Sequence, residues 1–223
     1  KYEIFTSMIE QQGAVPTNSL FERSVTARRI QFADYMLDNP AIDKDEALRV
    51  SIGNGNKPLI EKCLMKGAAA GPALTYAISK NDLALATSSI EQYSADASTS
   101  LPLAVGKGSI PMVTLLLDKG ADASSGLKAA VDTLSLPMVN LLLERGADNT
   151  AEMANAAGRG GDAIVQAMIS KGGDANAGMA AAVKADKAST VKILVEAGAD
   201  PAPAMAYAVD KSNGPLLELL ISK

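Results

Sequence analysis

The chain has 223 residues, of which 48% are hydrophobic and 21% are charged, and this composition is typical of a folded protein rather than a disordered one. Its formal net charge of −4 at pH 7 argues against broad electrostatic binding to the phosphate backbone of nucleic acid. Histidine is absent and Cys63 is the single cysteine, which excludes imidazole catalysis, histidine metal sites, an internal disulfide and multi-cysteine metal sites.

Similar strings of sequence recur along the chain at a spacing of 26 residues. They are LLLDKGAD at 115–122, LLLERGAD at 141–148, AMISKGGD at 167–174 and ILVEAGAD at 193–200. Earlier positions at the same phase hold Gly13, Asn39, Gly67 and Ser94, residue types that favour helix ends and turns. The pattern predicts a single domain with a partial repeat over 1–18 and repeats over about 19–45, 46–72, 73–98, 99–124, 125–150, 151–176, 177–202 and 203–223.

Each repeat is predicted to begin with a short helix. An apolar residue is followed three and four positions later by a small residue and, in most repeats, a β-branched one, and this spacing marks one buried helix face. The small column consists of Ser24, Ser51, Ala77, Ala104, Ala130, Ala156, Ala182 and Ala208. A small residue in every repeat indicates that another backbone lies against this position.

A second helix is predicted to follow in each repeat and to end at the turn glycine. Its first turn holds a proline in several repeats, where the missing N–H costs nothing, at Pro58, Pro111, Pro137 and Pro215. Residues 2–12 match a second helix that lacks its first helix, so the chain begins in the middle of a repeat. Because the final helix over 214–223 is apolar and has no closing turn, we expect a further segment of the natural chain, or a partner, to cover it.

The small column together with the leucine run and the Gly-Ala-Asp turn resembles the ankyrin repeat, over essentially the whole chain. The resemblance implies an all-α fold: a curved ankyrin-type solenoid of about eight helical hairpins. The 26-residue unit is about seven residues shorter than the usual repeat of about 33, and the missing length coincides with the β-hairpin finger. We therefore expect truncated fingers and short loops between helices.

By the same resemblance, the chain is expected to be a non-catalytic protein–protein interaction scaffold. Ankyrin-type first helices line the concave face, so residues just before the small column would be displayed there together. Arginine and tyrosine often anchor partners. The predicted partner-binding residues are Arg49, Tyr76, Lys128, Asn155 and Tyr207.

Another protein is the expected partner, whereas nucleic acid, a membrane, a small-molecule substrate, a cofactor or a metal is not expected. No apolar run approaches the roughly 20 residues that span a bilayer. Two alternatives remain open: a structural subunit of a larger assembly, and a secreted effector or virulence protein that binds host proteins, because the first residue is Lys1 rather than Met. We expect a reducing intracellular environment, which is the host cytosol in the effector case.

Three other features have simpler interpretations than a chemical site. The glycine-rich segment 158–162 resembles a phosphate-binding loop, but its repeat phase places it at a turn between helices and the Lys-Ser/Thr pair is absent. Cys63 aligns with Leu116 and Leu142, so we expect a buried, inert thiol. The acidic pair Asp43 and Asp45 is not predicted to lie in a cleft.

Overall fold

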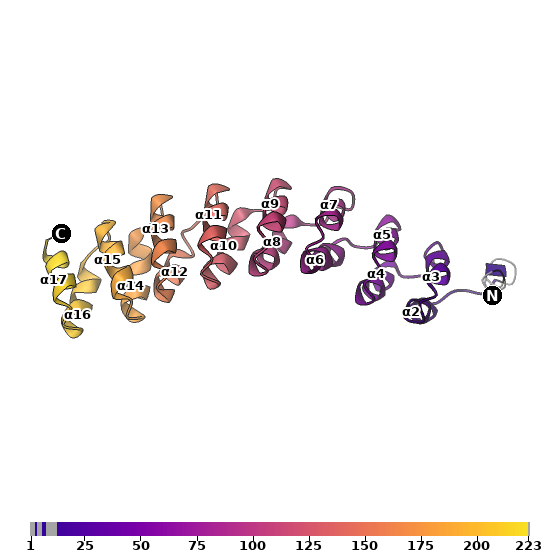
Figure 1. Cartoon of the computed structure of the whole chain (residues 1–223), viewed down its shortest axis with the longest axis horizontal. Coiled ribbons are helices and arrows are strands. Elements are labelled where there is room, and N and C mark those ends of the chain that lie inside the picture. The colour runs from indigo at the N-terminus through magenta and orange to yellow at the C-terminus, as the bar shows by residue number, and fades with distance from the viewer. Residues whose placement is uncertain (1–2, 4–5, 8–12, 223) are drawn as a thin grey trace. The chain divides into compact units, whose positions relative to one another are not determined.

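The computed structural model describes residues 3, 6–7 and 13–222. Within these residues the secondary structure consists of helices α2 to α17 with no strand, so the fold is all-α (Figure 1). The helices belong to two compact units, unit 1 (Lys1–Asp96) and unit 2 (Ala97–Lys223). The second helix predicted over residues 2–12 lies outside the described residues, apart from residues 3, 6 and 7.

Unit 1 is built from helix pairs. Its helices are α2 (Asn18–Thr26), α3 (Ile30–Met36), α4 (Lys44–Gly53), α5 (Lys57–Met65), α6 (Gly71–Lys80) and α7 (Leu83–Glu91). Each even-numbered helix packs on the helix that follows it, and the first helices of successive pairs also pack together, α2 on α4 and α4 on α6. The side-by-side first helices form the surface on which the sequence places its candidate residues.

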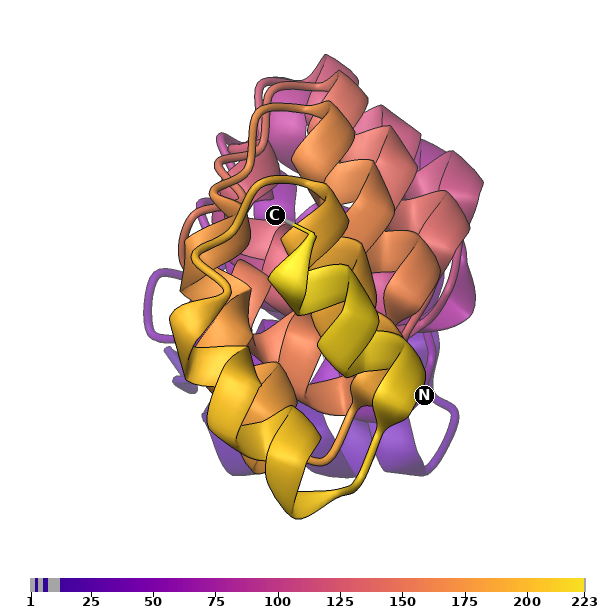
Figure 2. The same ribbon diagram turned by 90° about the vertical axis from the view of Figure 1, so that its left-hand side faces the viewer.

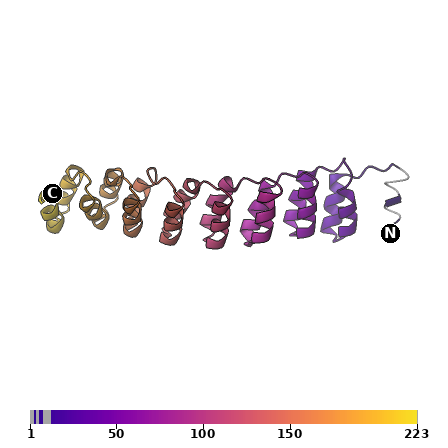
Figure 3. The same ribbon diagram turned by 90° about the horizontal axis from the view of Figure 1, so that it is seen from above.

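Unit 2 repeats the same arrangement (Figure 3). Its helices are α8 (Ala97–Gly106), α9 (Ile110–Asp118), α10 (Ala123–Asp132), α11 (Leu136–Glu144), α12 (Met153–Arg159), α13 (Asp162–Ser170), α14 (Ala175–Lys184), α15 (Ala188–Glu196), α16 (Ala202–Asp210) and α17 (Gly214–Ile221). First helices pack in the order α8, α10, α12, α14 and α16, and second helices pack in the order α11, α13, α15 and α17.

The small column predicted from the sequence is buried in both units. In unit 2, α12 and α14 lie in close contact at Gly178, the residue before Met179. A Cβ added at Gly178 would lie 2.9 Å from the Cβ of Ala157, so there is no room for a side chain at this position. The prediction that this column lies on the buried face of each first helix is therefore confirmed.

The ends of the second helices follow from local stereochemistry. The four prolines of the column lie at the first or second position of α5, α9, α11 and α17. The turn glycines that follow α5, α9, α11, α13 and α15 have φ between +85° and +95°, a left-handed conformation that residues with a Cβ rarely adopt. The repeated glycine is thus required by the turn that ends each second helix.

A set of inter-repeat hydrogen bonds, which the sequence did not predict, joins successive first helices. In each, a side-chain oxygen near the start of a first helix accepts from a backbone N–H that lies 24 or 25 residues later, just before the next first helix. For example, Asp45 Oδ1 accepts from the N–H of Ala69 at 2.7 Å in unit 1, and Ser124 Oγ accepts from the N–H of Asp148 at 3.0 Å in unit 2. These bonds fix the spacing between neighbouring pairs.

Pro102 lies inside α8 and removes one N–H from its hydrogen-bond ladder. The carbonyl that this N–H would have met belongs to Ser98. The hydroxyl of Ser125, on α10, lies 3.1 Å from that carbonyl oxygen and 2.7 Å from the carbonyl oxygen of Asp122. The single hydroxyl proton of Ser125 can be donated to either carbonyl oxygen. The next repeat can thus partly replace the hydrogen bond that Ser98 loses because of Pro102.

Candidate functional site

The five predicted partner-binding residues lie on first helices of the two units. Arg49 on α4 and Tyr76 on α6 belong to unit 1, and Lys128 on α10, Asn155 on α12 and Tyr207 on α16 belong to unit 2. Two of the five therefore lie in unit 1 and three in unit 2.

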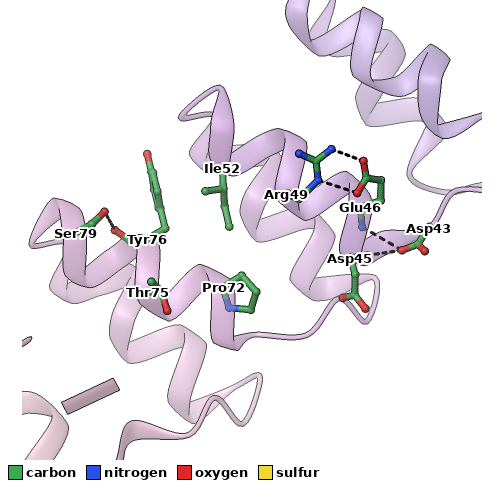
Figure 4. A pocket seen from close by; sticks show the side chains of 9 residues that line it. All are labelled: Asp43, Asp45, Glu46, Arg49, Ile52, Pro72, Thr75, Tyr76 and Ser79. Atoms are coloured by element: carbon green, nitrogen blue, oxygen red, sulfur yellow. Dashed lines mark hydrogen bonds and ion pairs between the residues drawn. The ribbon is translucent and has the colours of Figure 1, made fainter. Parts of the chain in front are cut away.

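In unit 1, a groove of about 750 Å³ lies between α4 and α6 and is open to solvent (Figure 4). Both predicted residues of this unit line it. The side of α4 contributes Asp43, Asp45, Glu46, Arg49 and Ile52, and α6 contributes Pro72, Thr75, Tyr76 and Ser79.

Local capping positions the acidic end of the groove. Asp43 precedes α4, and its Oδ1 accepts from the backbone N–H groups of Asp45 at 2.9 Å and Glu46 at 3.1 Å. Asp45 is held by its inter-repeat bond to Ala69. The expectation that nothing holds Asp43 and Asp45 in a cleft was wrong, because the start of α4 lies against α6, and one sequence repeat does not reveal this contact.

Arg49 is paired within its own helix. Its guanidinium donates to both carboxylate oxygens of Glu46, at 2.8 Å and 2.5 Å. Hydrogen bonding by Arg49 lowers the pKa of Glu46, and the same pair raises the pKa of Arg49. The Arg49 side chain is still 67% exposed, so it remains accessible to a partner from the groove.

Tyr76 forms the opposite wall. In Figure 4 it stands on α6 across from Arg49, with Ile52 between them in this view. The buried residues of α6 are Ala73, Leu74, Ala77 and Ile78. Tyr76 itself is half-buried, and the Lys80 ammonium lies 5.9 Å from the centre of its ring.

In unit 2, Lys128 and Asn155 meet at one carboxylate. The Asp132 side chain accepts from Lys128 Nζ at 2.7 Å, from Asn155 Nδ2 at 3.1 Å and from Arg159 at 2.7 Å. Hydrogen bonding by Lys128 is the largest cause of the lowered pKa of Asp132. The polar groups of this cluster are thus engaged with one another across α10 and α12.

Tyr207 is separate from that cluster and is buried, with 7% of its surface exposed. Its hydroxyl donates to Asp186 Oδ1 at 2.7 Å, and Lys211 pairs with the other oxygen at 3.0 Å. Burial, and secondarily the bond to Asp186, raises the pKa of Tyr207 to about 12. The sequence placed this ring on the displayed surface, whereas the structure packs it against the preceding repeat.

Other sequence features have structural explanations. Segment 158–162 runs from the last residues of α12 through a turn at Gly160, with φ 72°, and Gly161 to Asp162, which begins α13, so an anion there would meet a carboxylate. Cys63 is fully buried, and burial raises the pKa of its thiol to about 11. Among the described residues there is no group of three or more Cys, Asp or Glu side chains placed to hold a metal ion.

None of the helices described is both long enough and apolar enough to cross a membrane. Compared by sequence, the chain matches no protein family and no curated protein.

Proposed function

We propose that the chain is a non-catalytic protein-interaction scaffold of about eight ankyrin-type repeats, which binds a partner protein through the surface of its first helices. The observation that carries this proposal is the open groove between α4 and α6, because Arg49 and Tyr76 were selected from the sequence independently and both line it. Arginine and tyrosine, together with tryptophan, are enriched among the residues that anchor protein interfaces.

The form of the groove favours a chain segment over a small molecule. Small-molecule sites are usually concave and enclose most of the ligand surface, whereas this groove is an open trough between two neighbouring first helices. The core columns stay small or apolar from repeat to repeat, whereas the residues at the two positions before the small column differ between repeats and include Arg49, Tyr76 and Lys128. Surface residues that vary between repeats with a constant core support the recognition of another protein.

Unit 2 contributes less to this proposal. The Asp132 cluster engages Lys128 and Asn155, and Tyr207 is buried. We therefore assign the main contact to Arg49 and Tyr76. A partner that extends along unit 2 would have to compete with these internal bonds.

The test is selection from a displayed random peptide library on the full chain, followed by affinity measurements with the enriched peptides. Tyr76→Ala is expected to weaken binding about tenfold or more, as truncation of an anchor does. Tyr93→Ala, which removes a half-buried tyrosine of the same unit outside the groove, serves as the control. Enriched peptides that bind equally well to the Tyr76→Ala protein would contradict the proposal.

A second candidate is a structural subunit that packs through α16 and α17, the yellow helices that face the viewer in Figure 2, against a helix pair of another subunit. Val209 and Ile221 are 59% and 77% exposed, whereas Val131 and Leu117, at the same positions of earlier repeats, are 0% and 9% exposed. Sedimentation equilibrium would then show a mass that rises with concentration and that Val209→Lys lowers. A constant monomer mass would exclude this candidate.

A further inference from the structure

We infer that the groove of unit 1 binds an extended protein segment that carries one lysine or arginine side chain beside an apolar side chain. The inference rests on the proposed function, since it specifies the chemistry of the partner segment for that same groove. It follows from the uneven distribution of charge and apolar surface between α4 and α6.

The acidic end of the groove offers two carboxylates. Asp43 and Asp45 are both exposed, and their hydrogen bonds to backbone N–H groups are made through Oδ1. The Oδ2 atoms can therefore accept from an ammonium or guanidinium group without loss of the capping and inter-repeat bonds. Glu46 adds little, because Arg49 already neutralises it.

The balance of charge limits the number of cations that the groove favours. Asp43 and Asp45 together contribute two negative charges, and the amino ends of α4 and α6 offset these by roughly +0.5 each, which leaves about −1. At the other end, the ammonium of Lys80 lies beside the Tyr76 ring and would repel a second cation. The groove thus matches one basic side chain better than a polybasic run.

Apolar surface lies next to the acidic end. Ile52, Pro72 and Tyr76 line the groove, and Ile52 and Tyr76 are half-buried. Ile52 is seven residues along α4 from Asp45, which corresponds to about 10 Å at 1.5 Å per residue. In an extended segment, side chains two positions apart lie on the same face about 7 Å apart. The long, flexible stem of a lysine or arginine side chain can span the remaining distance of about 3 Å, so a basic and an apolar side chain with one residue between them fit the groove together.

The experiment uses a random dodecapeptide library displayed on phage and selected on the full chain. We expect enrichment of sequences in which lysine or arginine lies two positions from an aliphatic or aromatic residue. The best enriched peptide is then synthesised with a fluorescent label, and its affinity is measured by anisotropy at about 0.05 M and about 0.5 M salt, where screening of exposed charges differs strongly.

The decisive variant is the double change Asp43→Asn and Asp45→Asn, because asparagine retains both the cap and the amide oxygen acceptor while it removes the charge. We expect binding about fivefold or more weaker at the lower salt concentration, and a smaller difference at the higher one. The matched control is Asp122→Asn with Asp174→Asn, which changes two helix caps of unit 2 with the same chemistry. This control should leave the affinity unchanged.

The possible outcomes distinguish a failure of this inference from a failure of the proposed function. Peptides that depend on Tyr76 but lack a basic residue, or that bind the Asp43→Asn, Asp45→Asn protein normally, overturn the inference and leave the proposed function intact. Equal weakening by both asparagine pairs reveals non-specific charge attraction and also overturns the inference. Absence of any peptide that depends on Tyr76 contradicts the proposed function and the inference with it.

Discussion

Raising the pH above about 9 is expected to destabilise unit 1 through its buried thiol. Cys63 lies on α5 with no exposed surface, and its Sγ is 3.8 Å from the hydroxyl of Ser51 on α4. Burial raises the pKa of this thiol from 9.0 to about 11, because the thiolate would lose its hydration. The folded chain therefore keeps a proton that the unfolded chain releases.

The sign and size of the effect follow from this difference in proton binding. The stability due to the neutral thiol is fully present below pH 9.0 and is lost as the pH rises towards about 11. At about 1.36 kcal/mol per pKa unit, the free energy of unfolding falls by about 1.4 kcal/mol by pH 10 and about 2.3 kcal/mol by pH 11.

The assay is urea unfolding followed by far-UV circular dichroism, with the native protein compared with Cys63→Val, which removes the thiol at similar volume. The difference in unfolding free energy between the two proteins should change by about 1.4 kcal/mol between about pH 8 and about pH 10. Leu116→Val, at the equivalent position of unit 2, is the control, because it shortens a buried side chain without removing a titratable group, and its pH profile should stay parallel to that of the native protein. Parallel pH profiles for the native and Cys63→Val proteins would refute the reasoning.

Three further measurements test the packing and the charges. Ser89→Ala should raise the free energy of unfolding by about 1 kcal/mol in a urea titration. The reason is that the Ser89 hydroxyl is the one buried side-chain oxygen without a hydrogen-bond partner among the residues described. A loss of stability would show that this hydroxyl is hydrogen-bonded. Gly178→Ala should lower the thermal unfolding midpoint, since an overpacking cost of about 1–3 kcal/mol exceeds the gain in helix propensity. The control Gly53→Ala should not lower it, because a Cβ added at Gly53 meets no atom. Equal midpoints for the native and Gly178→Ala proteins would contradict the close helix contact. Acidification below pH 3.8 should reduce the free energy of unfolding, because the N–H of Leu85 and a lysine ammonium lower the pKa of Asp82 in the folded chain. The stability that the Asp82 carboxylate contributes is present above pH 3.8 and is lost as the pH falls through the lowered pKa. Asp82→Asn should therefore reduce the loss of stability at acid pH, and an unchanged loss would exclude Asp82 as its source.

Local rules account for the parts of the fold that the sequence predicted. The i, i+3, i+4 spacing of the small column identified the buried face of each first helix, and the structure buries all of its members. Proline marked the starts of α5, α9, α11 and α17, and glycine marked the left-handed turns after the second helices. These features depend on residues within one repeat, so a single sequence contains them.

Contacts between repeats account for what the sequence missed in the candidate site. Tyr207 is buried, and its hydroxyl reaches Asp186, which is 21 residues earlier, while Asn155 reaches Asp132 across 23 residues. The inter-repeat hydrogen bonds span 24 or 25 residues. The periodicity of one helix does not indicate which polar side chains of two neighbouring helices lie within hydrogen-bonding distance.

The sequence by itself determined that the chain forms paired helices, which face of each first helix is buried and where the second helices end, because periodicity and backbone stereochemistry act over a few residues. Only the tertiary structure decided that Asp43 and Asp45 border a groove with Tyr76, and that Lys128, Asn155 and Tyr207 are engaged within unit 2. Those outcomes depend on the distance and rotation between adjacent helix pairs, which packing sets through contacts between residues far apart in the chain.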